Sequence, residues 1–195
     1  STDVFVVSDH GFLTVDRVIH PNTLLVRAGL LRSDAEGNVT GGKIDTVSNG
    51  GSFFIYWPPG ENLKPVIERA LQPLINQNLV WGVLSRDALK DLGADPNAQL
   101  ALEAERGTMF DRLARGPVVT TRPMGGSHGY LPFRKGLQAA FIAFGPDIKV
   151  GVDLHLIRMT SIGPTILKAM RISDPKFGHR PALRGLWKQP RAQGR

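Results

Sequence analysis

The sequence predicts an α/β fold, and three observations support this prediction. Short apolar runs rich in β-branched and aromatic residues alternate with stretches in which apolar residues recur every three or four positions. Turns that contain glycine or proline separate these segments. The chain has 195 residues, of which 42% are hydrophobic and 21% charged, which is enough for one domain with a sizeable buried core.

The first expected strand covers residues 4–7, with the sequence VFVV. A continuous run of this type is typical of a strand that is buried on both faces of a parallel sheet. Such a strand needs neighbours, which normally precede it along the chain. We therefore expect the chain to begin in the middle of a larger fold, with a natural mature N-terminus as the alternative.

After the first strand the pattern predicts a small α+β insertion over residues 13–124. Strands are expected over residues 22–31 and 52–57, with a glycine-rich turn over residues 37–43. The turn also fits G-x-x-x-x-G-K, but Ile44 stands where a phosphate-binding loop needs Ser or Thr. A hairpin explains this segment better.

Two helices are expected in the middle of the chain. Asn62 can cap the first, whose apolar residues recur at three- and four-residue steps, and Pro73 should kink or end it. The run LVWGVL, from Leu79, is a strand candidate. Residues 85–92 then form a short helix that Gly93 stops.

The last third of the chain returns to strands and ends on a helix. Residues 118–129 lead from a strand into a loop rich in glycine and serine. AAFIAFG, residues 139–145, has the composition of a second buried strand, and LHLIRM, residues 154–159, alternates like a half-buried one. We expect the last helix to be entered through Ser161 and Pro164.

The net charge of +7 comes from the C-terminal part of the chain. Residues 1–133 hold 12 basic and 14 acidic side chains, whereas residues 134–195 hold 12 basic and 3 acidic ones. The basic residues lie among prolines and glycines, without the interleaved aromatic residues of a single-strand-binding face. A solvated flank or docking surface is therefore favoured over nucleic-acid binding.

Composition excludes several other classes of protein and site. No apolar run approaches the roughly 18 to 20 residues that a membrane span needs, so we expect a soluble protein, in a compartment that the sequence leaves open. The chain has no cysteine, which excludes disulfides, thiolate metal sites and cysteine nucleophiles. A transition-metal site must therefore use histidine and carboxylate ligands.

Asp9 and His10 follow directly on the first expected strand. Ligands bind at the carboxyl ends of strands in open α/β sheets, so both side chains are expected at an edge of the sheet where a ligand can bind. Neighbouring side chains of a regular strand point to opposite faces, so the backbone must bend for both to reach one ion, and Gly11 makes such a bend inexpensive. His128 lies in a second flexible loop, in GGSHGYLP. Carboxylate and imidazole together suit zinc.

Four segments resemble the C-terminal half of the alkaline phosphatase superfamily, in particular its type I phosphodiesterase and nucleotide pyrophosphatase branch. They are SDHGF at residues 8–12, GSHGYLP at 126–132, AAFIAFGPDIKVG at 139–151 and RMTSIGPTILKAM at 158–170. The resemblance implies that residues 1–195 form the C-terminal part of a sandwich of helices around a mostly parallel sheet.

The resemblance also implies roles for individual residues. Asp9 and His10 would bind one zinc ion of a two-metal centre and His128 the other, with other divalent metals possible. Tyr130 would form a wall of the site, with core packing as an equal alternative. The nucleophile and the remaining ligands would lie in the N-terminal half of the parent protein. Only eight residues precede Asp9 in this sequence, so that half is not among residues 1–195. Three ligands cannot complete two roughly tetrahedral sites, so the chain alone should bind zinc poorly and hydrolyse nothing.

The partners implied are the missing half of the same protein and a small phosphate ester, with phosphodiesters and nucleotide pyrophosphates favoured. A catalytically silent binding or structural module that kept the fold is the alternative. Other histidines are expected to be structural. Asp16 and His20 have Asp-x-x-x-His spacing, but they follow the SDHG motif instead of preceding it, and His155 and His179 are expected to be packed or solvated.

Overall fold

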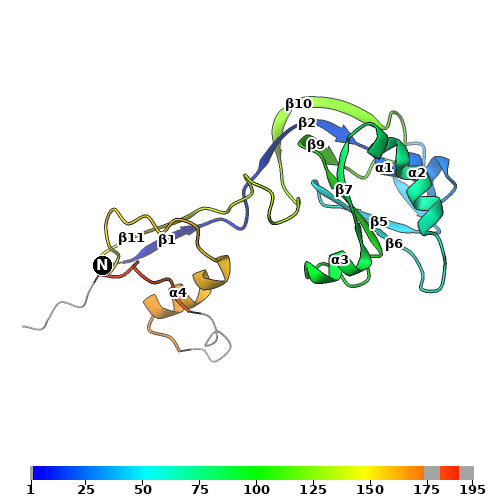
Figure 1. The fold of residues 1–195 in the computed structure, drawn as a ribbon. Coiled ribbons are helices and arrows are strands. Elements are labelled where there is room, and N and C mark those ends of the chain that lie inside the picture. Colours follow the sequence, from blue (N-terminus) through cyan, green and yellow to red (C-terminus); the bar gives the residue numbers. More distant parts are fainter. Residues whose placement is uncertain (1, 174–180, 189–195) are drawn as a thin grey trace, which may run out of the picture. The chain divides into compact units, whose positions relative to one another are not determined.

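The computed structural model describes residues 2–173 and 181–188, and the chain divides into two compact units (Figure 1). We name Ser1–His10 together with Gln138–Arg195 the terminal unit, and Gly11–Leu137 the central unit. The expectation for His179 lies outside the described residues. The role of residues 13–124 as an insertion stays a prediction.

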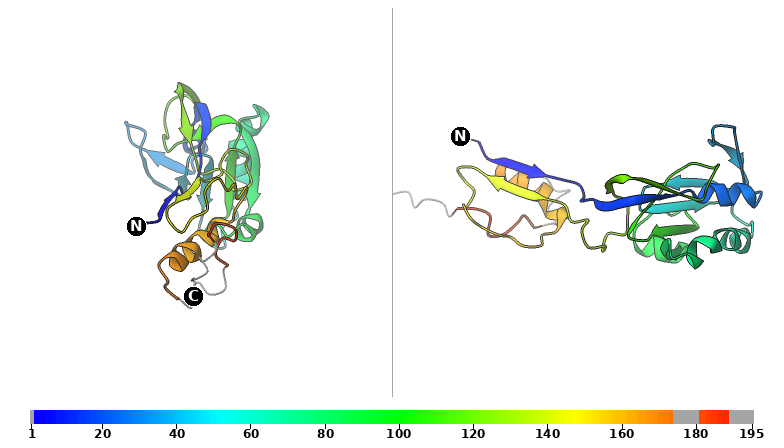
Figure 2. Two further views of the ribbon diagram at one scale, coloured as in Figure 1. Left: turned by 90° about the vertical axis from the view of Figure 1, so that its left-hand side faces the viewer. Right: turned by 90° about the horizontal axis from the view of Figure 1, so that it is seen from above.

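The described part of the terminal unit is a strand pair with a helix on one side (Figures 1 and 2). Strands β1 (Val4–Val7) and β11 (Phe141–Phe144) pair in antiparallel orientation. Helix α4 (Ile162–Ala169) follows the 3-10 turn η1 (Met159–Ser161). The helix begins where the sequence predicts it.

The environment of β1 differs from the prediction of a strand buried in a parallel sheet. Its register places Val4 opposite Phe144 and Val6 opposite Ile142, so these four side chains share one face. All four are exposed, by between 37% and 56%. The second strand expected to be buried, β11, is equally open. A run of apolar residues indicates that a strand needs cover, and among the described residues this face has none.

Residues 154–159 form no strand, which corrects a second expectation. His155 adopts a left-handed conformation, with φ of 52°, and this interrupts an extended chain. Its side chain is solvated and lies 3.3 Å from the Asp153 carboxylate. The helix α4 is fixed instead through Thr165, whose hydroxyl donates to the Ser161 carbonyl and accepts from the Leu183 amide.

The central unit is built on a sheet of four antiparallel strands, in the order β5 (Asp45–Ser48), β6 (Ser52–Tyr56), β8 (Leu100–Ala104) and β7 (Val80–Ser85). The side chains of β6 point alternately to the two faces of the sheet, and each face packs against a different helix. Phe53 and Ile55 pack into the main core with α2 (Lys64–Asn76), and Phe54 and Tyr56 pack around α3 (Arg86–Asp91). The two central strands, β6 and β8, are thereby covered on both faces, whereas the edge strands β5 and β7 keep exposed side chains.

A second sheet and a hairpin complete this unit: β10 (Val119–Ser127), β2 (Leu13–Ile19) and β9 (Gly107–Phe110) form the sheet, and β3 (Leu31–Ser33) and β4 (Val39–Gly42) the hairpin. Among the strand pairs described, β2 with β9 is parallel and the others are antiparallel. The expected mostly parallel sheet is therefore wrong. Short connections explain the antiparallel pairing of β3 with β4 and of β5 with β6, because a parallel pair needs a long crossover. Pairs such as β1 with β11 join segments that are distant in sequence, and no local signal sets their direction.

Residues 22–31, expected as a strand, form helix α1 (Pro21–Arg27) and the start of β3. Proline suits the first turn of a helix, where its missing N–H is not needed. The buried side of α1 includes Asn22, Thr23 and Leu25, so tertiary burial decides its conformation. The hairpin expected near residues 37–43 is present, although residues 39–42 belong to its second strand.

The two middle helices are largely as expected. Helix α3 is capped by Ser85, whose hydroxyl accepts from the Ala88 amide, and Gly93 follows it with φ of 71°. Helix α2 differs from the prediction at its cap, where Leu63 stands instead of Asn62. The helix continues to Asn76, so Pro73, whose position is exposed, does not end it. The carbonyl that loses its partner there can be hydrated.

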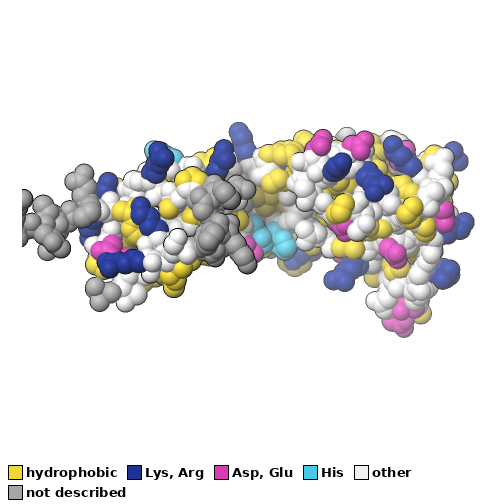
Figure 3. All heavy atoms as spheres, turned by 90° about the horizontal axis from the view of Figure 1, so that it is seen from below, with side chains coloured by type: hydrophobic (Ala, Val, Ile, Leu, Met, Phe, Trp, Pro, Cys, Tyr) yellow, Lys and Arg dark blue, Asp and Glu magenta, His cyan; other side chains and the backbone are white. Residues whose placement is uncertain are grey.

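In the described residues no helix has both the length and the apolar character to cross a membrane. Figure 3 shows basic and acidic side chains interspersed on the visible face of the central unit.

Candidate metal-binding site

Asp9 and His10 lie just beyond the end of β1, where the backbone leaves the strand. The Ser8 amide donates to the Ala140 carbonyl, and the Ser8 hydroxyl accepts from the Ala140 amide. The Asp9 carboxylate then accepts a hydrogen bond from the His10 amide, at 3.0 Å. This local turn brings the two neighbouring side chains to the same side of the chain, as a shared ion would require.

The two side chains present an oxygen and a nitrogen donor at a suitable separation. Asp9 Oδ2 and His10 Nε2 are 3.5 Å apart, and the Asp9 and His10 side chains are 85% and 34% exposed. Zinc binds such atoms at roughly 2.0 to 2.2 Å, which places tetrahedral ligands about 3.3 to 3.6 Å from each other. The pair is therefore compatible with one zinc ion in kind and in spacing, and would supply two of about four ligands.

His128 follows β10 in the central unit and is half-buried. Its carbonyl accepts a hydrogen bond from the Gly51 amide at 2.7 Å, and its ring stands edge-on to that of Phe12, with centroids 5.9 Å apart. The Phe12 side chain is 61% exposed. The His128 imidazole thus lies on a loop whose backbone is bonded to the turn before β6.

The structure brings Asp9 and His10 together. His128 belongs to the other unit, so its meeting with these two residues stays a prediction. Within the described part of either unit, no three His, Cys, Asp or Glu side chains gather closely enough to hold a metal ion. Tyr130 is 6% exposed and its hydroxyl donates to the Thr108 carbonyl, which shows its packing role; a contact with substrate stays a prediction.

Glu103, on β8, is a residue of this region that the sequence analysis missed. It is fully buried, and one of its oxygens accepts from the Leu131 amide at 3.0 Å. Burial raises the pKa of Glu103 to about 7, an effect that the Leu131 amide, Arg134 and Ser52 partly offset. A single acidic residue inside the apolar run LALEA was the available signal.

His20 takes part in a separate network in the central unit. Its Nδ1 lies 2.6 Å from Asp111 Oδ1 and its Nε2 lies 2.8 Å from Thr120 Oγ1, so both nitrogens of this buried ring are satisfied. Asp16 instead lies on β2, with Arg17 as its neighbour at 3.9 Å. The expectation that Asp16 and His20 do not form a metal site stays a prediction, and the structure gives His20 a structural role.

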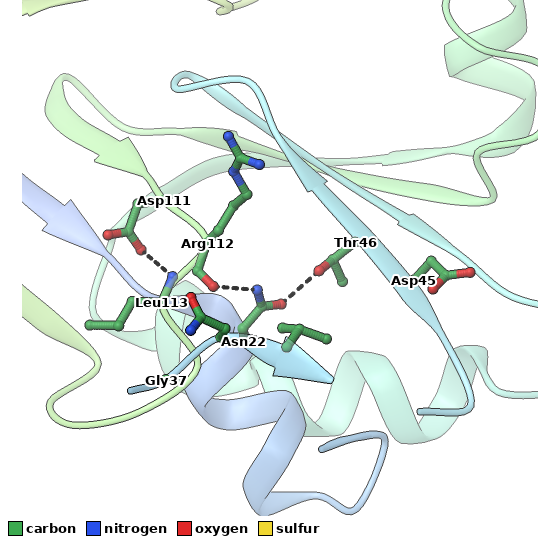
Figure 4. Close-up of a pocket in the computed structure, with 9 residues that line it drawn as sticks. Asn22, Gly37, Asp45, Thr46, Asp111, Arg112 and Leu113 are labelled. Carbon is green, nitrogen blue, oxygen red and sulfur yellow. Dashed lines mark hydrogen bonds between the residues drawn. The ribbon is translucent and has the colours of Figure 1, made fainter. Parts of the chain in front are cut away.

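Asp111 also borders a pocket of about 500 Å³ in the central unit (Figure 4). Asn22 lies in the middle of its wall, where its amide nitrogen donates to the Arg112 carbonyl and its amide oxygen accepts from the Thr46 hydroxyl. These bonds join α1 to β5 and to the loop after β9. They hold the wall of the pocket together.

The amino-acid sequence matches the type I phosphodiesterase / nucleotide pyrophosphatase family over residues 1–131. That range includes Asp9, His10 and His128. The chain belongs to this family. The resembling segments at residues 139–151 and 158–170 lie beyond the matched range. No sequence among the curated proteins matches the chain.

One solved structure is similar to this chain in fold. Human ectonucleotide pyrophosphatase / phosphodiesterase 5 (ENPP5) is similar with a TM-score of 0.61 and 15% identity, over 88% of this chain and 41% of its own. Two structures of the murine protein, one of an inactive form in complex with AMP, give TM-scores of 0.47 and 18% identity. They cover 75% of this chain and 35% and 34% of theirs. The chain thus spans about two fifths of the length of the human relative.

Proposed function

We propose that this chain contributes three metal ligands, Asp9, His10 and His128, to a zinc-dependent hydrolase of phosphodiesters or nucleotide pyrophosphates. The convergence of Asp9 Oδ2 and His10 Nε2 to 3.5 Å is the observation that carries the proposal. Family membership supports the reaction class. The nucleophile and the remaining ligands come, in this proposal, from a preceding part of the same protein.

The residues of the chain would act in the following way. Asp9 supplies an anionic oxygen and His10 a neutral imidazole nitrogen to one zinc ion, and His128 supplies an imidazole to the second. All three must be deprotonated at the ligating atom, so metal binding is accompanied by proton release. Bound zinc would stabilise charge on the phosphoryl oxygens and lower the pKa of an attacking hydroxyl.

The open face of β1 and β11 supports a contribution from another part of the protein. Val4, Val6, Ile142 and Phe144 present a contiguous apolar surface there. A two-stranded sheet is marginally stable by itself and gains stability when a further layer covers it. We propose that the preceding part of the protein packs on this face and thereby completes the α/β sandwich.

The test is zinc binding and hydrolysis by this chain with and without the preceding part of its protein. Calorimetry on the chain alone should show at most weak zinc uptake. With the preceding part present, zinc-dependent cleavage of bis-p-nitrophenyl phosphate should appear, and His128→Ala should reduce it by several orders of magnitude. His155→Ala is the matched control, because that exposed histidine should be replaceable without loss.

Near-full activity in the His128→Ala protein would reject the ligand assignment. Tight stoichiometric zinc binding by the chain alone would show that other residues complete the centre. A folded full-length protein that binds no zinc and cleaves no phosphate ester would establish the alternative, a silent module that kept the fold.

A further inference from the structure

The loop of residues 127–131, which carries His128, is hydrogen-bonded to the rest of the central unit at almost every position. We name this segment the histidine loop. The Gly51 amide donates to the His128 carbonyl at 2.7 Å, and the Ser52 hydroxyl donates to the next carbonyl, that of Gly129. The backbone on both sides of the His128 peptide is therefore held by the turn that precedes β6.

Glycines allow this close approach. A Cβ on Gly51 would lie 2.2 Å from the ring of Tyr130, and a Cβ on Gly129 would lie 1.7 Å from the carbonyl oxygen of Asn49. A Cβ on Gly50 would lie 2.7 Å from the carbonyl oxygen of His128. No side chain could be added at these positions without displacing the Tyr130 ring or the facing backbone, so the loop and the turn fit against each other directly.

Glu103 joins the two bonded segments from the middle of the sheet. Its Oε1 accepts from the Leu131 amide at 3.0 Å, at the end of the histidine loop. Its Oε2 lies 3.4 Å from the Ser52 hydroxyl, on the neighbouring strand, and this is the hydroxyl that bonds Gly129. One buried carboxylate thus contacts the loop directly and also through Ser52.

Arg134 provides the compensating charge. Its Nε lies 3.7 Å from Glu103 Oε1, and its guanidinium carbon lies 5.2 Å from the centroid of the Trp81 ring. The Arg134 side chain is 8% exposed, and it also donates to the Ala104 carbonyl. A buried carboxylate is tolerated when it is paired and hydrogen-bonded in this way.

We propose that Glu103 is a positioning residue, which holds the histidine loop through Leu131 and Ser52 and so sets the direction in which the His128 imidazole is presented. The use of that imidazole as a metal ligand rests on the proposed function. The positioning itself does not, because every contact that carries it lies within the central unit and involves no metal.

The test is hydrogen exchange and histidine NMR on the 195-residue chain, without metal or substrate. Glu103→Met removes both acceptors at similar length. Amide exchange at Gly51 and Leu131 should then accelerate by roughly ten- to hundredfold, as the loss of one or two buried hydrogen bonds implies. The His128 ring signals should lose the shift that the neighbouring Phe12 ring imposes, while the signals of His20 stay in place.

Three controls separate positioning from general stability. Glu61→Met makes the same change at an exposed position and should alter none of these signals. Glu103→Gln keeps an acceptor for the Leu131 amide and should restore most of the protection. Ser52→Ala tests the same link from the other side, and it gives a result even where Glu103→Met does not fold.

Unchanged His128 signals and unchanged exchange at Gly51 and Leu131 in a folded Glu103→Met or Ser52→Ala protein would overturn the inference. So would acceleration at these amides that only parallels exchange at Leu71, in the core of α2, because that pattern reports global unfolding. Neither measurement uses zinc, so failure here is distinct from failure of the proposed function.

Discussion

In the terminal unit the Asp9 carboxylate is 85% exposed and is held by the turn to His10, whereas in the central unit the backbone around His128 is bonded to buried residues of two strands. The positions of Asp9 and His10 are set by one local turn on a two-stranded sheet, and the backbone around His128 by a network of buried hydrogen bonds. Local turns are easily rearranged, while a buried network has few alternative arrangements. We therefore expect the backbone around His128 to be more rigid than that of Asp9 and His10.

The largest expected effect is at the glycine turn beneath the histidine loop. Gly51→Ala places a methyl group 2.2 Å from the Tyr130 ring, and we expect the free energy of unfolding to fall by about 3 kcal/mol or more. Gly82→Ala is the control, since a Cβ there meets nothing within 4 Å and should change stability by less than about 1 kcal/mol. Urea unfolding measures both. Equal losses of stability in the two variants would contradict the close fit between Gly51 and the histidine loop.

The next effect is a pH dependence that Glu103 imposes on the central unit. Its pKa is raised from 4.5 to about 7, so between these values the folded protein holds a proton that the unfolded chain has released. The stability of the folded state must therefore fall as the pH rises through this window, by about 2 to 3 kcal/mol. Glu103→Gln should lack this decline.

The measurement is the free energy of unfolding of both proteins from pH 4.5 to 8, compared as a difference, because other carboxylates titrate in both. Parallel curves would show that Glu103 titrates alike in the folded and unfolded chains. A decline confined to the unsubstituted protein would assign this pH dependence to Glu103.

A smaller effect on stability is expected in the hydrogen-bond network of His20 in the central unit. Thr120→Val removes the hydroxyl that lies 2.8 Å from His20 Nε2, at a cost of about 1 kcal/mol. Thr121→Val, the next residue of β10, is exposed and should cost less than about 0.5 kcal/mol. Thermal unfolding of the two variants tests this. A larger loss at Thr121 would contradict the assignment.

The smallest effect is expected on the open face of the terminal unit. Val6→Thr at a 49% exposed position should change the stability of the chain alone by less than about 0.5 kcal/mol. Val15→Thr, the same change at a 1% exposed core position, should cost about 1 to 3 kcal/mol. If the preceding part of the protein packs on this face, Val6→Thr should also weaken their association, which a binding titration would detect.

Local signals were sufficient for several elements. The three- and four-residue period located α2, and Ser85 with Gly93 bounded α3. Strand direction could not be predicted, because the apolar run at Val4–Val7 is compatible with either pairing and its partner, Phe141–Phe144, lies far along the chain. The seven residues of α1 are too few for a period to be distinguished from a strand.

The candidate site was predictable to a similar extent. The sequence indicated Asp9 and His10 and the bend that brings them to one side, and the structure places Asp9 Oδ2 3.5 Å from His10 Nε2. Their role as metal ligands stays a prediction. The support of His128 could not be predicted, because it depends on Ser52, Glu103 and Leu131, which are distant in sequence and become neighbours only through β6 and β8. Contacts between residues that are distant in sequence leave no local pattern in the amino-acid sequence.

The central unit also begins and ends at one place, since the Gly11 amide donates to the Leu137 carbonyl at 2.9 Å. A segment whose two ends are hydrogen-bonded to each other can be exchanged as a cassette, because both junctions fall at the same point and neither requires a spacer. Recombination among relatives could therefore replace residues 11–137 as a block. His128 would travel with the block, and Asp9 and His10 would remain with the host.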